Sequence, residues 1–113
     1  HVMPLRKESE KAKEKREAGI VKVLEAAGAK TKDHCWRVEW LLKTTVGDLL
    51  IVPYERWVHC RFQDSLAARE ARIGSGETGK WNWHGSDFTD WSGRVQGLHV
   101  QQIIDRLRCY KLI

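Results

Sequence analysis

The sequence predicts an α+β fold in which a long N-terminal helix, a short connecting helix and a C-terminal helix pack on one mainly antiparallel sheet of three or four strands. Three observations predict it: a run of helix-forming residues from 5 to 27, alternation of apolar and polar residues between 34 and 62, and an apolar stripe at helical spacing from 100 to 107. A chain of 113 residues is long enough for a single domain with one core of modest size.

The first predicted helix covers residues 5 to 27, which contain no Pro and are rich in Ala, Glu, Lys and Leu. It runs into Gly28, and a glycine suits the left-handed position that follows many helices. Apolar residues occur almost only in its second half, since residues 6 to 17 read RKESEKAKEKRE. We therefore expect residues 1 to 17 to be a charged helical arm that projects or packs against something outside the core.

Strand periodicity follows from residue 34 onward. Residues 34 to 46 form the first predicted strand, residues 49 to 52 the second and residues 57 to 62 the third, with turns at Gly47-Asp48 and at residues 53 to 56. Neighbouring strand residues point to opposite faces of a sheet. The predicted core face carries Trp36, Val38, Trp40, Leu42, Val58, Cys60 and Phe62, and the outer face carries Cys35, Arg37, Glu39, Leu41, Lys43, Trp57, His59 and Arg61.

The remaining elements are a connecting helix through SLAAREAR, capped by Asp64 or Ser65, and a fourth strand over residues 80 to 84. The last predicted element is a C-terminal helix. Its apolar stripe is expected to close the core and consists of Val100, Ile103, Ile104 and Leu107.

The segment GSGETGKW, residues 74 to 81, matches seven of the eight positions of the phosphate-binding pattern G-x-x-x-x-G-K-[ST]. That pattern works when a buried strand leads into the loop, a helix begins at the Lys, and a Ser or Thr binds magnesium. Here a predicted helix precedes the loop, Trp81 follows Lys80, and WNWH has strand alternation. We therefore predict a connecting loop and no bound nucleotide.

Metal binding and catalysis also lack converging residues. The dipeptide His-Cys occurs at 34–35 and 59–60, but strand neighbours diverge and no C-x-x-C or H-x-x-x-H spacing is present. The same divergence argues against a Cys60 nucleophile activated by His59. The sequence predicts no metal, no cofactor and no enzymatic activity, with a small hydrolase as a less favoured alternative.

Composition indicates where the protein works. No stretch approaches the roughly 20 apolar residues of a membrane span, and the first residues show no signal-peptide pattern. Three widely spaced cysteines do not suggest a disulfide framework. We expect a cytoplasmic protein with no membrane contact.

Binding of another macromolecule is the function that remains. A charged helical arm and any exposed tryptophan are typical of interfaces, so a protein partner or a homodimer is favoured. The net charge of +5 leaves nucleic acid as the alternative, with the outer sheet face and the arm as its contacts. The candidate binding residues are Arg37, Lys43, Trp57, His59, Arg61, Lys11 and Lys15.

Two segments, PYERWVHCRF and GETGKWNWHG, carry a resemblance. They resemble the Y-x-x-W-V-x-C-R-F and S-G-K-W-N-x-H segments of small uncharacterised proteins of bacterial phages and other mobile elements, over about residues 49 to 88. That family often has Ser where this chain has Thr78. The resemblance implies a bacterial cytoplasm and an accessory role, and it implies no catalytic residues because the family has no established activity.

Overall fold

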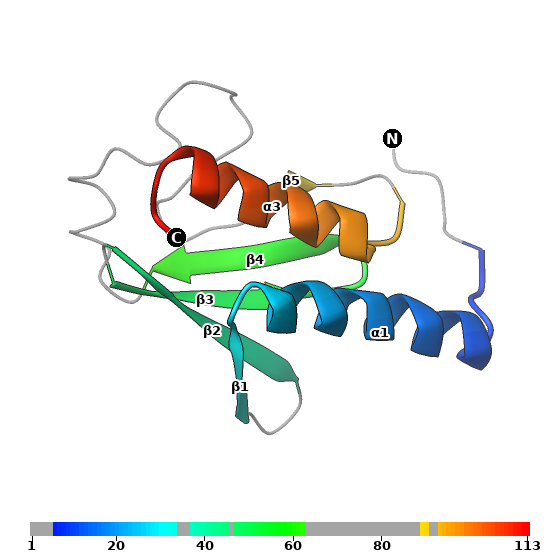
Figure 1. The fold of residues 1–113 in the computed structure, drawn as a ribbon. Helices are drawn as coiled ribbons and strands as arrows, with labels where there is room; N and C mark the ends of the chain where they lie inside the picture. The colour runs from blue at the N-terminus through cyan, green and yellow to red at the C-terminus, as the bar shows by residue number, and fades with distance from the viewer. Residues whose placement is uncertain (1–5, 34–36, 46, 63–88, 91–92) are drawn as a thin grey trace.

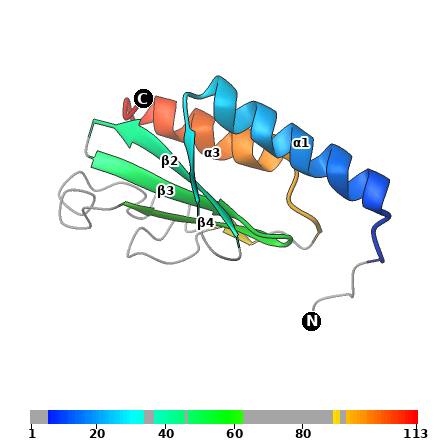
Figure 2. The same ribbon diagram turned by 90° about the horizontal axis from the view of Figure 1, so that it is seen from below.

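The computed structural model describes residues 6–33, 37–45, 47–62, 89–90 and 93–113. Over these residues the chain has an α+β fold, in which helices α1 (Glu10–Ala26) and α3 (Gly97–Cys109) lie side by side on one face of an antiparallel sheet (Figures 1 and 2). The predicted fold class and both terminal helices are thereby confirmed. The predicted connecting helix and the predicted strand at residues 80 to 84 lie outside the described residues.

The sheet is a meander whose strands lie in chain order, each antiparallel to the next. Its strands are β1 (Lys30–Asp33), β2 (Val38–Thr44), β3 (Gly47–Pro53), β4 (Trp57–Phe62) and β5 (Thr89–Asp90). β1 was not predicted from the sequence because KTKD contains no apolar residue and therefore no alternation of polarity. The predicted strand from 34 to 46 is shorter in the structure and begins at Val38.

Two rows of paired residues form the floor of the core. Trp40 pairs with Ile51, which pairs with Cys60 on β4, and the next row is Leu42, Leu49 and Phe62. All six side chains are buried, as are the four residues of the predicted stripe on α3. The faces predicted for β4 are confirmed, since Val58, Cys60 and Phe62 are buried while Trp57 and Arg61 are exposed.

Two residues of β2 depart from the predicted alternation. Val38 was expected in the core but is 58% exposed, because it begins the strand at the end of the sheet, where the helices do not cover it. Glu39 was expected to face solvent but is only 4% exposed. Its burial is compatible with a charge because Arg37 pairs with it.

Helix α1 begins at Glu10, five residues later than predicted, where the Ser9 hydroxyl accepts a hydrogen bond from the Ala12 amide at 3.1 Å. Gly28 follows the helix with a φ of 90°, as its position predicted. The first half of α1 is tied to the segment before α3. Arg16 donates one hydrogen bond to the carbonyl of Val95 at 3.1 Å and another to Glu8 at 2.9 Å.

Candidate functional site

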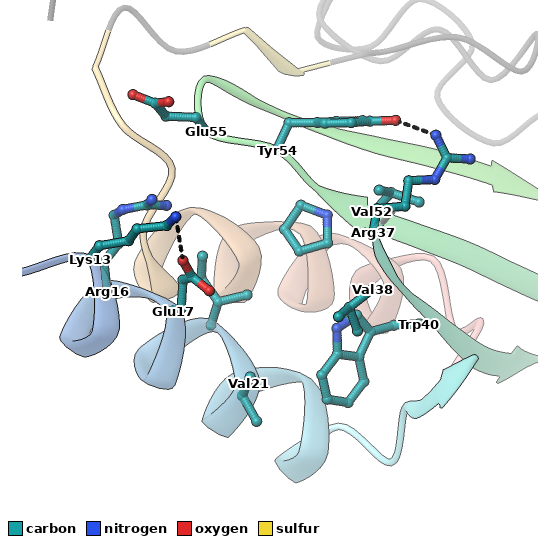
Figure 3. A pocket seen from close by; sticks show the side chains of 12 residues that line it. Lys13, Arg16, Glu17, Val21, Arg37, Val38, Trp40, Val52, Tyr54 and Glu55 are labelled. Atoms are coloured by element: carbon teal, nitrogen blue, oxygen red, sulfur yellow. Dashed lines mark hydrogen bonds and ion pairs between the residues drawn. The ribbon is translucent and has the colours of Figure 1, made fainter. Parts of the chain in front are cut away.

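A groove of about 360 Å³ lies between α1 and the end of the sheet where β2 begins and β3 ends (Figure 3). It forms because α1 continues past the sheet, with polar residues over its first two turns, while β2 starts only at Val38. One wall includes Ile20 and Val21 of α1, and the opposite wall includes Val38 and Pro53. Its volume and largely apolar lining are typical of a pocket that receives a ligand or a partner's side chain.

The floor of the groove contains a polar atom that finds no hydrogen-bond partner in the described part of the chain. Trp40 is only 4% exposed, and among the described residues nothing accepts a hydrogen bond from its indole N–H. Figure 3 shows the indole nitrogen turned toward the space enclosed by the labelled side chains. Buried tryptophans usually place this N–H against an acceptor, so a buried indole N–H without one is an unusual feature of this groove.

The aromatic rim, which we define as Tyr54 and Trp57, lies beside the groove. Their ring centroids are 5.3 Å apart with the planes tilted by 38°. The Tyr54 amide donates to the Trp57 carbonyl at 2.8 Å, which closes the turn between β3 and β4 and holds both rings at this end of the sheet. Trp57 is 38% exposed, so part of its ring is available to a partner.

Arg37 joins this rim to the buried carboxylate of Glu39. It donates to the Tyr54 hydroxyl at 2.7 Å and to Glu39 through two nitrogens, at 2.7 and 2.8 Å. The hydrogen bond to Glu39 raises the pKa of the Arg37 guanidinium above its ordinary value. The charge of Arg37 is therefore balanced within the protein and holds the groove wall in place.

A second set of ion pairs fixes the wall that α1 forms. Glu8 accepts from Arg16 at 2.9 and 3.2 Å and lies 3.7 Å from Arg94, which also contacts Glu55 at 3.2 Å. Arg94 donates a further hydrogen bond to the carbonyl of Arg6. The bond from Arg16 lowers the pKa of the Glu8 carboxyl below its ordinary value. These contacts link the start of α1 to the turn that carries the aromatic rim.

The structure brings together two of the seven candidate residues, since Arg37 and Trp57 both contact Tyr54. The other five are dispersed. His59 and Arg61 lie along β4, Lys43 lies beside the β2–β3 turn, and Lys11 and Lys15 are exposed on α1. Val38 and Trp40 were not predicted as site residues because alternation placed both in the core. Only the position of α1 beyond the end of the sheet distinguishes these two residues from the other residues on that face.

Catalytic and metal-binding sets do not emerge from the described part of the chain. No three His, Cys, Asp or Glu side chains within it could hold a metal ion. Cys60 is fully buried among apolar side chains, and its neighbour His59 lies on the other face of β4. The GSGETGKW segment and the other polar residues between 74 and 88 lie outside the described residues.

Within the same ranges, neither helix combines the length and hydropathy that crossing a membrane requires. No protein-family model, curated protein or solved structure matches this chain.

Proposed function

We propose that the chain is a non-enzymatic accessory domain that acts by binding another protein, and that a segment of the partner docks in the groove between α1 and β2. The observation that carries the proposal is the exposure of Val38 at this groove. This aliphatic residue is 58% exposed directly beside a concave, largely apolar surface. Apolar groups grouped around a concavity mark interaction sites more often than single exposed residues do.

The aromatic rim extends this surface. Tryptophan and tyrosine are the residues most enriched among those that dominate binding energy at protein interfaces. Trp57 combines partial exposure with a position fixed by Tyr54, so its ring needs little ordering when a partner binds. The resemblance of PYERWVHCRF to segments of mobile-element proteins supports an accessory role, and that resembling segment includes both rings of the rim.

Nucleic acid is the second candidate, and one observation favours it. Lys11 and Lys15 lie one turn apart on α1, both exposed, and neither forms an ion pair with another described residue. Such cations can neutralise phosphates, and binding would then weaken steeply with added salt. Arg37 supports this candidate less, because its charge already pairs with Glu39.

Site-specific photo-crosslinking tests the proposal. A photoreactive amino acid replaces Val38 in one variant and Lys22, which is exposed elsewhere on α1, in the matched control. In a bacterial lysate we expect a protein adduct from position 38 that the control does not give and that Trp57→Ala weakens. Mass spectrometry of the adduct separates a foreign protein, a second copy of this chain and nucleic acid. Equal adducts from both positions would contradict the proposal.

A further inference from the structure

The indole N–H of Trp40 indicates what the partner must bring into the groove. Trp40 is nine-tenths buried or more, lines the groove and has no acceptor for this N–H among the described residues. A buried donor that lacks an acceptor costs free energy, and an occupant that supplies an acceptor recovers it. An apolar wall next to a hydrogen-bond donor that has no acceptor is complementary to a ligand that is apolar over most of its surface and carries one acceptor.

The charges around the groove favour a neutral acceptor. Glu17 and Glu55 also line the groove, and they pair with Lys13 and Arg94, so neither lining carboxylate calls for a charged ligand. Two of the lining cations are already committed, since Arg16 pairs with Glu8 and Arg37 pairs with Glu39. The third, Lys13, lies 3.9 Å from Glu17. A peptide carbonyl beside an apolar side chain has the required combination without a charge.

We infer that the groove binds a partner segment through one bulky apolar side chain whose neighbouring main-chain carbonyl accepts a hydrogen bond from the indole N–H of Trp40. The apolar side chain lies against Val21, Val38 and Pro53, while the carbonyl reaches the floor. The inference rests on the proposed function, since it takes the groove to be the surface that the partner occupies.

Three small probes with the same apolar body test the hydrogen bond on the full chain. N-acetyl-phenylalaninamide carries neutral carbonyls, 3-phenylpropionate carries a carboxylate, and ethylbenzene carries no acceptor. Titrations are followed by the indole N–H resonances in ¹⁵N–¹H NMR spectra, where the Trp40 signal is the one absent from Trp40→Phe. We expect the amide probe to shift this resonance downfield and to bind more tightly than the other two.

The Trp40→Phe variant keeps an aromatic ring and removes the donor. It should weaken binding of the amide probe by roughly three- to tenfold, the size of one hydrogen bond, and leave ethylbenzene within about twofold. If this variant does not fold, the comparison of the three probes on the unaltered protein still decides. Equal affinity for the amide probe and ethylbenzene would overturn the inference, because the donor would then be contributing nothing.

The two proposals fail separately. A partner that crosslinks from position 38 while the amide probe shows no preference over ethylbenzene would overturn only the hydrogen-bond inference. An amide preference without any crosslinked partner would instead count against the proposed function. A tighter fit of 3-phenylpropionate than of the amide probe would also overturn the inference and identify a small carboxylate as the ligand.

Discussion

The main-chain oxygen of Gly19 on α1 lies 3.0 Å from the position that a Cβ atom on Gly97 of α3 would occupy. The Gly19 carbonyl carbon and a methyl group of Val23 are 3.2 and 3.4 Å from the same point. The two helices thus approach each other closely where α3 begins, and the absence of a side chain at Gly97 permits it. This contact sets how α1 lies over the sheet, and with it one wall of the groove.

Gly97→Ala should destabilise the protein by roughly 1–3 kcal/mol, because the new methyl group meets main-chain atoms that cannot rotate away. Gly19→Ala is the matched control. A Cβ there meets nothing within 4 Å, and alanine in a helix interior is favoured over glycine by roughly 0.5–1 kcal/mol. Urea unfolding of both variants measures the difference, and equal stabilities would contradict the close approach.

Arg37→Ala should lower the melting temperature, since Glu39 would lose two charge-assisted hydrogen bonds while remaining buried. The hydroxyl of Tyr54 would lose its donor as well. Arg61→Ala, an exposed change on β4, should stay within about 0.5 kcal/mol of the parent. Thermal melts at matched pH compare the two, and a loss as large in Arg61→Ala would refute a special role for the Arg37–Glu39 pair.

Val38→Ser should leave stability within about 1 kcal/mol because the side chain is mostly exposed. The same change should weaken partner binding by at least about fivefold, if a partner residue packs on this valine. Leu98→Ser is a suitable control, since Leu98 is 57% exposed on α3 and does not line the groove. Affinity measured by calorimetry with the crosslinked partner should therefore fall only for the valine variant.

The pH dependence of stability should contain a contribution from His99. Burial lowers the pKa of this imidazole below its ordinary value of about 6.5, and its Nδ1 accepts a hydrogen bond from the Gln96 amide at 2.9 Å. The unfolded chain therefore binds a proton more readily than the folded one. Stability is full above about pH 6.5 and falls as the pH drops through that value toward the lower folded pKa.

His99→Gln removes this titration, because glutamine stays neutral across the range. Its unfolding free energy, followed by denaturant titration between pH 5 and 8, should decline less on acidification than that of the unaltered protein. A parallel decline in both proteins would show that His99 does not carry the effect.

Periodicity closely predicted the elements in which buried and exposed residues follow a regular spacing. The strand at residues 57 to 62, the stripe on α3 and the glycine after α1 all follow from local spacing. Local spacing could not predict β1, which is polar and stabilised by pairing with β2. Nor could it predict that Glu39 would be buried, because its burial depends on Arg37 and on the surroundings of the sheet face.

The groove also could not be predicted from the sequence, because it depends on how the helices lie over the sheet. Alternation assigned Val38 and Trp40 to the same face, which is correct, but it cannot say where along that face the covering helix leaves a gap. The charged residues 6 to 17 gave a partial signal, since a helix that is polar over its first turns was expected to reach beyond the core. What it reaches toward depends on contacts with residues some eighty positions later.

The hydrogen bond from Arg16 to Val95 spans 79 positions of the chain, and this has a consequence for synthesis on the ribosome. The hairpins of β2, β3 and β4 join neighbours in sequence and can pair soon after each turn emerges. The start of α1, although translated before these hairpins, gains its anchor only when residues 94 and 95 have left the exit tunnel. This wall of the groove is therefore completed after the hairpins, and a nascent chain presents no finished binding surface until residues 94 and 95 have emerged.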